Sequence, residues 1–233
     1  MSFSYIIIGA GRQGVAAAFD LATFGDAASI QFVDARETAA KAAAAAINRL
    51  TGRAVASSRA GDARDASAMS AIISGASAIV SAAHYDVNLG LTELAAASGV
   101  HMCDLGGNTD VVRAQHRFDA VARGTGATIV PDCGMGPGLN VSLAAYAMSR
   151  LDVPREVRIW DGGLPQNPEP PWNYRSTFAM SGLTNEYDGT ASFLRDGAIV
   201  DVPCFSDLEE LEFAAPIGRL EAFVTSGGLS TAP

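Results

Sequence analysis

The stretch Tyr5–Gly14, YIIIGAGRQG, decides the fold of this chain. Its first four residues are apolar and rich in β-branched side chains, which is typical of a strand buried on both faces. Gly9, Gly11 and Gly14 follow in the pattern G-x-G-x-x-G, and the next residues, VAAAFDLATFG, have the composition of a helix that ends at Gly25. The glycines therefore lie at a strand-to-helix turn, the setting in which this pattern binds the pyrophosphate of a dinucleotide.

Each residue of this turn has an expected role in cofactor binding. Gly9 permits the tight turn, Gly11 lets a pyrophosphate approach the backbone, and Gly14 lets the helix pack closely on the strand. Arg12 is placed to flank the pyrophosphate, although a solvated turn residue is the plainer interpretation, and Gln13 completes the turn.

A second apolar run, Ser29–Asp34, ends in an acid about 20 residues after the last glycine, the spacing at which a carboxylate binds the adenosine ribose. A carboxylate there also repels a 2′-phosphate, so Asp34 predicts NAD rather than NADP as the cofactor. Arg36 tolerates a phosphate and weakens this preference. Asp62, just beyond the next strand, is a candidate for the adenine amino group, and an ordinary turn acid is an equal alternative.

Strands and helices alternate along the first 150 residues. The expected strands are 5–8, 29–34, 54–57, 78–83, 100–105 and 127–130, and the expected helices include 34–50, 65–73, 84–97, a helix that ends at 123, and 140–150. This alternation predicts an α/β fold with a Rossmann-type, doubly wound parallel sheet. Ligands bind outside the carboxyl ends of such strands, and Ser81, Ala82 and Ala83 are small enough to leave room for a cofactor there.

The composition changes near residue 153, which suggests a second domain. Expected strands lie at 156–160, 175–180, 191–195, 198–202, 208–213 and 220–224, and Asp196-Gly197 is a hairpin-turn signal. The short links favour an α+β domain with a mainly antiparallel or mixed sheet. We place the cofactor domain at 1–125 and the substrate domain at 126–233, with 126–150 as a bridge.

The overall composition excludes several classes of partner. A net charge of −9 and a pI of about 4.7 argue against binding to nucleic acid or to an anionic membrane surface. No apolar run approaches the length of a membrane span, and the first residues do not have the pattern of a secretory leader. Three cysteines without metal-site spacing predict a reduced, cytoplasmic protein with no metal site. We expect a homo-oligomer that acts on a small amino-acid substrate.

Five stretches together resemble the saccharopine dehydrogenase-like family, and most closely its lysine 6-dehydrogenase branch. They are GAGRQG in the first turn, PDCGMGPGLN at 131–140, GGLPQNPEPPWNY at 162–174, GLTNEYDG at 182–189 and LEAFVTSGGLST at 220–231. The resemblance implies NAD-dependent oxidative deamination of the ε-amino group of L-lysine to the 6-semialdehyde, which cyclises. It also implies a longer chain, so we expect the second domain to be incomplete here.

Oxidation of an amine requires a base, because only the neutral amine has a lone pair to expel hydride. Lys41 is the only lysine and lies in an Ala-rich helix, so acids and histidine are the candidates. Asp132, after the sixth strand, is the first choice, and Asp104, after the fifth, follows the same logic. For both, an N-cap or turn acid is the alternative.

Four further residues complete the set of candidates. Histidine as a residue type titrates near neutrality, and His84 follows the fourth strand with Tyr85 beside it, although a lone histidine is more often structural. Glu186 is a candidate to hold a substrate ammonium, and Arg175 to pair with an α-carboxylate. An exposed loop acid and a surface salt bridge are the respective alternatives.

Two other functions stay open. A saccharopine dehydrogenase acts on a similar C–N bond in a substrate with extra carboxylates, which would require more basic residues than the second domain supplies. Its arginines are Arg155, Arg158, Arg175, Arg195 and Arg219. The other alternative is a truncated NAD-binding remnant without catalysis.

Overall fold

The computed structural model describes residues 2–176 and 180–226. They belong to two compact units. The first contains Met1–Leu105 and Asp110–Cys133, and the second contains Gly106–Thr109 and Gly134–Pro233.

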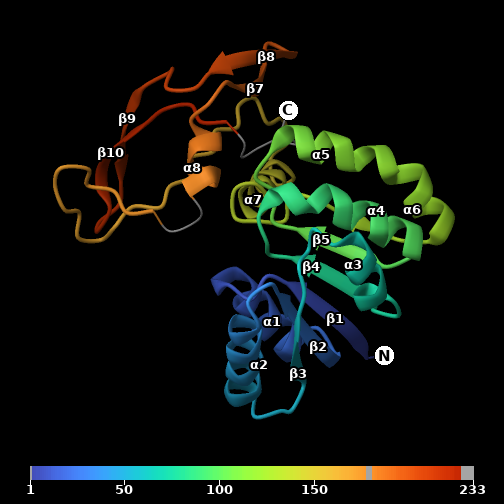
Figure 1. Cartoon of the computed structure of the whole chain (residues 1–233). Coiled ribbons are helices and arrows are strands. Elements are labelled where there is room, and N and C mark those ends of the chain that lie inside the picture. The colour runs from blue at the N-terminus through green and yellow to red at the C-terminus, as the bar shows by residue number, and fades with distance from the viewer. Residues whose placement is uncertain (1, 177–179, 227–233) are drawn as a thin grey trace. The chain divides into compact units, whose positions relative to one another are not determined.

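The first unit is built on a parallel six-stranded sheet with the order β3-β2-β1-β4-β5-β6 (Figure 1). Its strands are β1 (Phe3–Ile8), β2 (Ala27–Asp34), β3 (Ala56–Ala60), β4 (Ala78–Ser81), β5 (His101–Asp104) and β6 (Ile129–Val130). The strand order reverses between β1 and β4, as in the Rossmann fold. The predicted α/β fold with a doubly wound parallel sheet is therefore confirmed.

Helices connect these strands. They are α1 (Arg12–Phe24), α2 (Glu37–Thr51), α3 (Ala66–Ile73), α4 (Asn88–Ser98), α5 (Thr109–Gln115) and α6 (Asp119–Thr125), with single turns η1 (Tyr85–Val87) and η2 (His116–Phe118). The expected N-cap of α3 is confirmed, because Asp65 Oδ1 accepts a hydrogen bond from Ala68 N–H at 3.0 Å. The helix predicted to end at 123 is wrong as one element, since η2 separates α5 from α6.

The strand boundaries also differ from the prediction, and for the third and fourth strands the difference bears on the site. The third strand lies at Ala56–Ala60 rather than 54–57, because it pairs with Ile30–Asp34 of β2 in that register. The fourth strand ends at Ser81, so Ala82 and Ala83 belong to the following loop.

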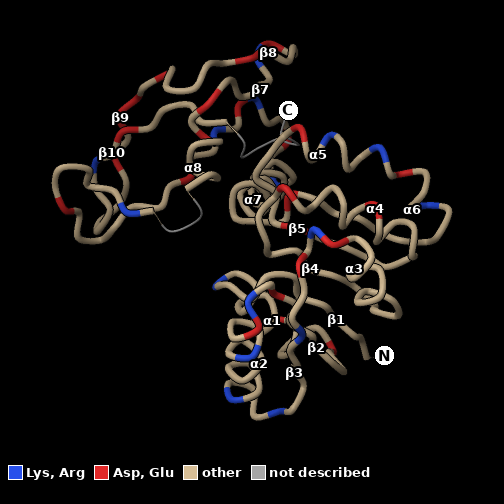
Figure 2. Tube along the Cα trace, in the orientation of Figure 1, with Lys and Arg blue, Asp and Glu red and all other residues tan. Residues whose placement is uncertain are grey.

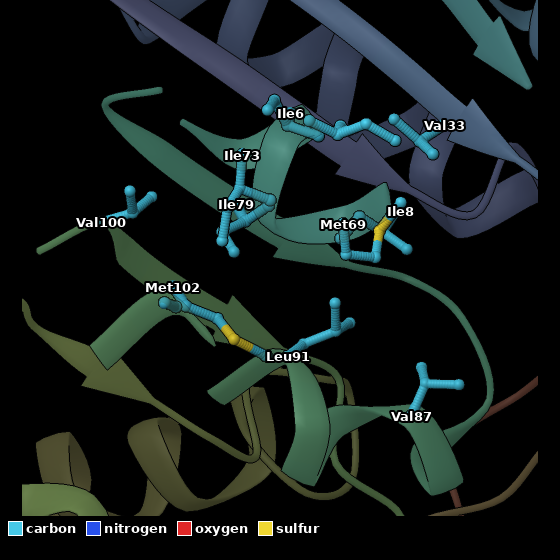
Figure 3. Packing of buried hydrophobic residues seen from close by; sticks show 12 residues of the cluster. Ile6, Ile8, Val33, Met69, Ile73, Ile79, Val87, Leu91, Val100 and Met102 are labelled. Carbon is cyan, nitrogen blue, oxygen red and sulfur yellow. The ribbon is translucent and has the colours of Figure 1, made fainter. Parts of the chain in front are cut away.

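Two separate cores pack against the sheet. Ile7, Phe32 and Val80 belong to one core, with the alanine-rich surfaces of α1 and α2. Ile6 and Ile8 belong to the other, with side chains from α3 and α4 (Figure 3). Apolar residues in succession along β1 are thus required, because the strand is covered on both faces.

The described part of the second unit contains two helices and two separate antiparallel hairpins. The helices are α7 (Leu139–Met148) and α8 (Met180–Glu186), and the hairpins pair β7 (Thr190–Arg195) with β8 (Ala198–Pro203) and β9 (Glu209–Phe213) with β10 (Gly218–Ala222). Asp196 and Gly197 have φ of 51° and 77°, as a two-residue type I′ turn requires. Figure 2 shows the acidic residues along β9 and β10.

Two strands predicted in this unit are wrong. Residues 156–160 have no regular structure, and Trp160 contacts β9 through its indole N–H, which donates to Glu209 Oε1 at 2.8 Å. Among the described residues, no strand pairs with this segment. In the stretch predicted as a strand at 175–180, Arg175 and Ser176 are irregular and Met180 begins α8. Residues 177–179 lie outside the described residues.

The apolar side chains of the second unit are mostly exposed. Val202 and Val224 are buried, and Tyr187, Phe205 and Phe223 form an aromatic cluster. Large exposed apolar side chains include Leu139, Leu143, Tyr146, Leu194 and Ile199. Within the described ranges, the helices of both units are too short or too polar to cross a membrane. Self-association of the chain stays a prediction.

Candidate functional site

In the glycine turn after β1, a side chain would have room at Gly11 but none at Gly9 or Gly14. Gly9 has φ of +98°, and a Cβ there would lie 2.7 Å from the Ala82 carbonyl oxygen. A Cβ on Gly14 would lie 2.0 Å from the Gly9 carbonyl oxygen. By contrast, a Cβ on Gly11 would meet no described atom within 4 Å. The turn is therefore closely packed on both sides of an opening at Gly11.

Gly11 is also the N-cap residue of α1, and no described side chain caps that helix end. The N–H groups of a first helical turn have no partner within the helix, and the helix dipole is positive there. The opening at Gly11 thus combines space with hydrogen-bond donors, and both suit a pyrophosphate.

Asp34 lies at the carboxyl end of β2, against the same turn. Its Oδ2 accepts a hydrogen bond from Ala10 N–H at 2.9 Å, and its Oδ1 accepts one from Arg36 N–H at 2.9 Å. The Asp34 side chain is 13% exposed, whereas that of Arg36 is 76% exposed, with its Nε 3.6 Å from Asp34 Oδ1. The carboxylate is held in place beside the glycine turn.

The small residues after β4 have different roles. Ser81 is fully buried, and its hydroxyl donates to Asn88 Oδ1 at 2.7 Å, which fastens the end of the strand to α4. Ala82 N–H donates to the Ile8 carbonyl oxygen at 2.8 Å. Ala82 therefore continues the contact between the ends of β1 and β4, next to Gly9.

His84 ends this loop and Tyr85 begins the turn η1, and the structure gives His84 two partners that were not predicted from the sequence, Asp86 and, through it, Arg64. His84 Nδ1 lies 2.9 Å from Asp86 Oδ1, and Asp86 Oδ2 accepts a hydrogen bond from Arg64 Nη2 at 2.6 Å. The rings of His84 and Tyr85 lie 4.2 Å apart between centroids. Partial burial raises the pKa of Asp86, but the hydrogen bonds from Arg64 and His84 outweigh it, so this pKa lies below its ordinary value.

Asp62, the adenine candidate, lies in the loop that carries Arg64. Its Oδ1 accepts a hydrogen bond from Arg64 N–H at 3.0 Å, and the side chain is 57% exposed. This bond forms the local turn before α3.

Asp104 and Asp132 are brought together at the ends of β5 and β6. Asp104 is fully buried, and its Oδ2 accepts a hydrogen bond from Gln115 Nε2 at 2.6 Å. Its Oδ1 accepts from Asp132 N–H at 3.4 Å, and its carbonyl oxygen accepts from Cys133 N–H at 2.7 Å. Asp132 is 6% exposed and has φ of 59°, a conformation that these contacts support.

The two thiols near these acids are poor nucleophiles at neutral pH. Burial, with smaller effects from Cys133 and Asp104, raises the pKa of Cys103 to about 11. Burial, with the charges of Asp104 and Asp132, also raises the pKa of Cys133. Both side chains therefore stay protonated, which suits a structural role.

In the second unit, Glu186 lies near Asp161 and Tyr174, two residues that were not predicted as site residues from the sequence. Burial, and then the negative charge of Asp161, raises the pKa of Glu186. Burial raises the pKa of Tyr174 as well, with the nearby Tyr187 and Glu186 adding to the effect. Asp161 Oδ2 would lie only 1.9 Å from a Cβ on Gly136, so the glycine makes room for this carboxylate.

Asn185, next to Glu186, is a structural anchor. Its side-chain amide donates to the Gly107 carbonyl oxygen at 2.9 Å and accepts from Asn108 Nδ2 at 2.9 Å. Arg175 is exposed and forms no ion pair with the residues that the structure describes. Across the described ranges, no three His, Cys, Asp or Glu side chains gather as a metal site would require.

Comparison with known proteins identifies the first unit. The family model described as the saccharopine dehydrogenase NADP-binding domain matches residues 5–130, which is more than half of the chain. The chain belongs to the saccharopine dehydrogenase family. It carries the NAD(P)-binding domain of that family, and the opening at Gly11 and the nearby Asp34 carboxylate fit such a cofactor.

The fold of this family member is similar to that of saccharopine dehydrogenase (L-Glu forming) from Saccharomyces cerevisiae, with a TM-score of 0.67 and 14% sequence identity. The match covers 95% of this chain and 49% of the yeast chain, so this chain spans about half the length of that enzyme. The identity is low enough that the likeness shows the fold alone.

More distant likenesses involve other dehydrogenases. Quinate dehydrogenase from Corynebacterium glutamicum, in complex with NAD, gives a TM-score of 0.40 and 21% identity over 58% of this chain and 46% of that chain. A putative myo-inositol dehydrogenase from Sinorhizobium meliloti 1021 gives 0.45 and 21% over 64% and 41%. Neither is similar enough to bear on the chemistry of this chain.

Proposed function

We propose that this saccharopine dehydrogenase-family chain takes part in NAD-dependent oxidative deamination of the ε-amino group of L-lysine. The observation that carries the proposal is the family membership of residues 5–130, combined with the open Gly11 turn and the Asp34 carboxylate beside it. The choice of L-lysine as the substrate rests on the resemblance of the stretches between residues 131 and 231 to lysine 6-dehydrogenases. The product is the 6-semialdehyde, which cyclises.

The preference for NAD over NADP rests on Asp34. Its carboxylate is held by Ala10 N–H and lies at the end of β2, where an acid accepts hydrogen bonds from both ribose hydroxyls. A 2′-phosphate at that place would meet a negative charge that is only 13% exposed to solvent and is therefore weakly screened. Arg36 offsets this repulsion in part, but most of its side chain faces water.

The proposed proton acceptor is Asp132, with Asp104 as the residue that positions it. Asp132 follows β6 at the carboxyl edge of the sheet, where ligands of this fold bind. The buried Asp104 carboxylate accepts from Asp132 N–H and so supports its left-handed backbone conformation. Asp132 would take the proton from the substrate ammonium, and the bound nicotinamide would supply the hydride acceptor.

In the second unit, Glu186 is proposed to bind a substrate ammonium. It is half-buried, and Asp161 contributes a second negative charge nearby. A cation beside both carboxylates would offset their mutual repulsion and lower the raised pKa of Glu186. Arg175, exposed and without an ion pair among the described residues, is proposed to receive the substrate α-carboxylate.

A second candidate function is oxidation of saccharopine, which the family of residues 5–130 favours. The two are separated by measuring NADH formation with L-lysine and with saccharopine, each against a reaction without amine. Lysine-dependent NADH formation supports the proposal, and saccharopine-dependent formation alone would replace it. Binding of NADH without turnover of either amine would indicate an NAD-binding chain without catalysis of its own.

A further inference from the structure

An ion pair joins the two loops that follow β3 and β4. Arg64, in the loop between β3 and α3, donates through Nη2 to Asp86 Oδ2 at 2.6 Å. Asp86 belongs to the turn η1, directly after the β4 loop. In a sheet with the order β3-β2-β1-β4, the carboxyl ends on either side of β1 border the crevice in which the dinucleotide lies. The pair therefore lies along the same edge of the sheet as the glycine turn and Asp34.

The loop that carries Arg64 begins against the proposed ribose-binding acid. Gly61 N–H donates to the Asp34 carbonyl oxygen at 3.1 Å. Arg64 comes three residues later in the chain. An arginine close to that acid is the residue type that accommodates the 2′-phosphate of NADP, because a guanidinium binds phosphate through paired hydrogen bonds. By place and by chemistry, Arg64 is suited to bind that phosphate.

Two carboxylates already engage this guanidinium. Asp86 Oδ2 lies 2.6 Å from Nη2, and Asp62 Oδ1 lies 3.9 Å from Nη1. Asp86 is itself held from its other side, because its Oδ1 lies 2.9 Å from His84 Nδ1. A phosphate that bound Arg64 would have to displace a fixed carboxylate and remain beside it.

We propose that Asp86 is a specificity-determining residue of the cofactor site. By holding the Arg64 guanidinium against the loop after β4, it withholds that guanidinium from a 2′-phosphate and so favours NAD over NADP. This inference rests on the proposed use of NAD as the cofactor. It assigns to Asp86 a role beyond that of Asp34, which repels the phosphate directly.

The test measures the dissociation constants of NADH and NADPH by fluorescence titration for the unaltered chain and for Asp86→Asn, Arg64→Gln and the double variant. Asp86→Asn keeps the shape of the side chain but removes its charge. We expect it to improve NADPH binding relative to NADH binding by about 3- to 5-fold, the scale of a partly exposed ion pair. In the Arg64→Gln background the same change should improve NADPH binding little or not at all.

Asp119→Asn is the matched control. It removes one negative charge and breaks an exposed pair, in which Asp119 Oδ2 lies 2.8 Å from Arg123 Nε, within the same unit. It should leave the ratio of the two constants unchanged, and thermal unfolding midpoints verify that each variant is folded. The inference is overturned if Asp119→Asn shifts the ratio as much as Asp86→Asn does. It is also overturned if Asp86→Asn shifts the ratio equally with and without Arg64, or not at all.

The proposed use of NAD is tested separately, by the ratio of the NADH and NADPH dissociation constants measured for the unaltered chain. Tighter binding of NADPH by that chain would contradict the proposed cofactor, whereas the change in ratio between variants would still decide the role of Asp86.

Discussion

The Asp34 carboxylate accepts a hydrogen bond from the backbone N–H of Ala10 at 2.9 Å. This bond connects the end of β2 to the glycine turn that follows β1. The acid and the turn are therefore joined at one edge of the sheet, and we propose that the ribose and the pyrophosphate of the cofactor bind there side by side.

Replacement of Asp34 by alanine should weaken NAD binding by about 1.5–3 kcal/mol, the contribution of a hydrogen bond to a charged group. NADP binding should change less, because the lost ribose contact is offset by the loss of repulsion. Isothermal titration with both cofactors measures the two effects. An equal affinity of the unaltered chain for NAD and NADP would remove the basis of this prediction.

Alanine at Gly14 should lower the stability of the fold, whereas alanine at Gly11 should weaken cofactor binding. At Gly14 the added Cβ would meet the Gly9 carbonyl oxygen at 2.0 Å, so the backbone must shift, at a cost of about 1–3 kcal/mol in the free energy of unfolding. At Gly11 the Cβ meets no described atom within 4 Å, and φ is −80°, so the fold should tolerate it. Gly11→Ala should instead weaken NADH binding, because the Cβ occupies the opening for the pyrophosphate.

Chemical denaturation and NADH titration of both variants distinguish these effects. If Gly11→Ala bound NADH as tightly as the unaltered chain, the opening at Gly11 would not be the pyrophosphate site.

The fold of the first unit follows closely from its sequence, for a physical reason. Strands covered on both faces must be continuously apolar, as Ile6, Ile7 and Ile8 are. The glycines mark the turn at which the strand ends and the helix begins. The position of Asp34 was predictable because a fixed length of chain connects β1 to the end of β2. These signals are local and do not depend on distant residues.

The Arg64–Asp86 pair could not be predicted in this way. The strands β2 and β1 separate β3 from β4, and the two residues meet because α3 and α4, which begin just after Arg64 and Asp86, pack side by side. The strand predicted at 156–160 was wrong for a related reason. Alternating side chains fit a strand only where a neighbouring strand is available, and in the described residues Trp160 contacts Glu209 through side chains alone.

Replacement of Asp132 by asparagine should lower kcat for lysine oxidation by roughly 10²–10⁴-fold, the usual contribution of a positioned base. The amide keeps the size of the side chain but cannot accept the proton, so NADH affinity should change little. His84→Gln is the comparison, since His84 is the accessible alternative with a carboxylate partner. A near-normal kcat in Asp132→Asn together with a large loss in His84→Gln would transfer the role to His84.

Glu186→Gln should stabilise the protein at neutral pH and have no such effect in acid. Burial, and then Asp161, raises the pKa of Glu186, so deprotonation costs more in the folded protein than in the unfolded chain. The folded state therefore loses stability as pH rises from about 4.3, the ordinary value for glutamate, through the raised pKa. Glutamine avoids this loss.

Thermal unfolding at pH 4 and at pH 7 measures the difference, with Glu93→Gln on the exposed surface of α4 as the control. Gains of equal size at both pH values would show that the burial of the Glu186 carboxylate is not their cause.

The most direct test of the proposed function follows hydrogen from substrate to cofactor. L-lysine deuterated at the ε-carbon is incubated with the protein and NAD, and the mass of the NADH formed is measured. If the ε-carbon is the hydride donor, NADH carries one deuterium from this substrate and none from lysine deuterated only at the α-carbon. Deuterium transfer from the α-carbon alone, or no transfer from lysine while saccharopine reduces NAD, would contradict the proposed function.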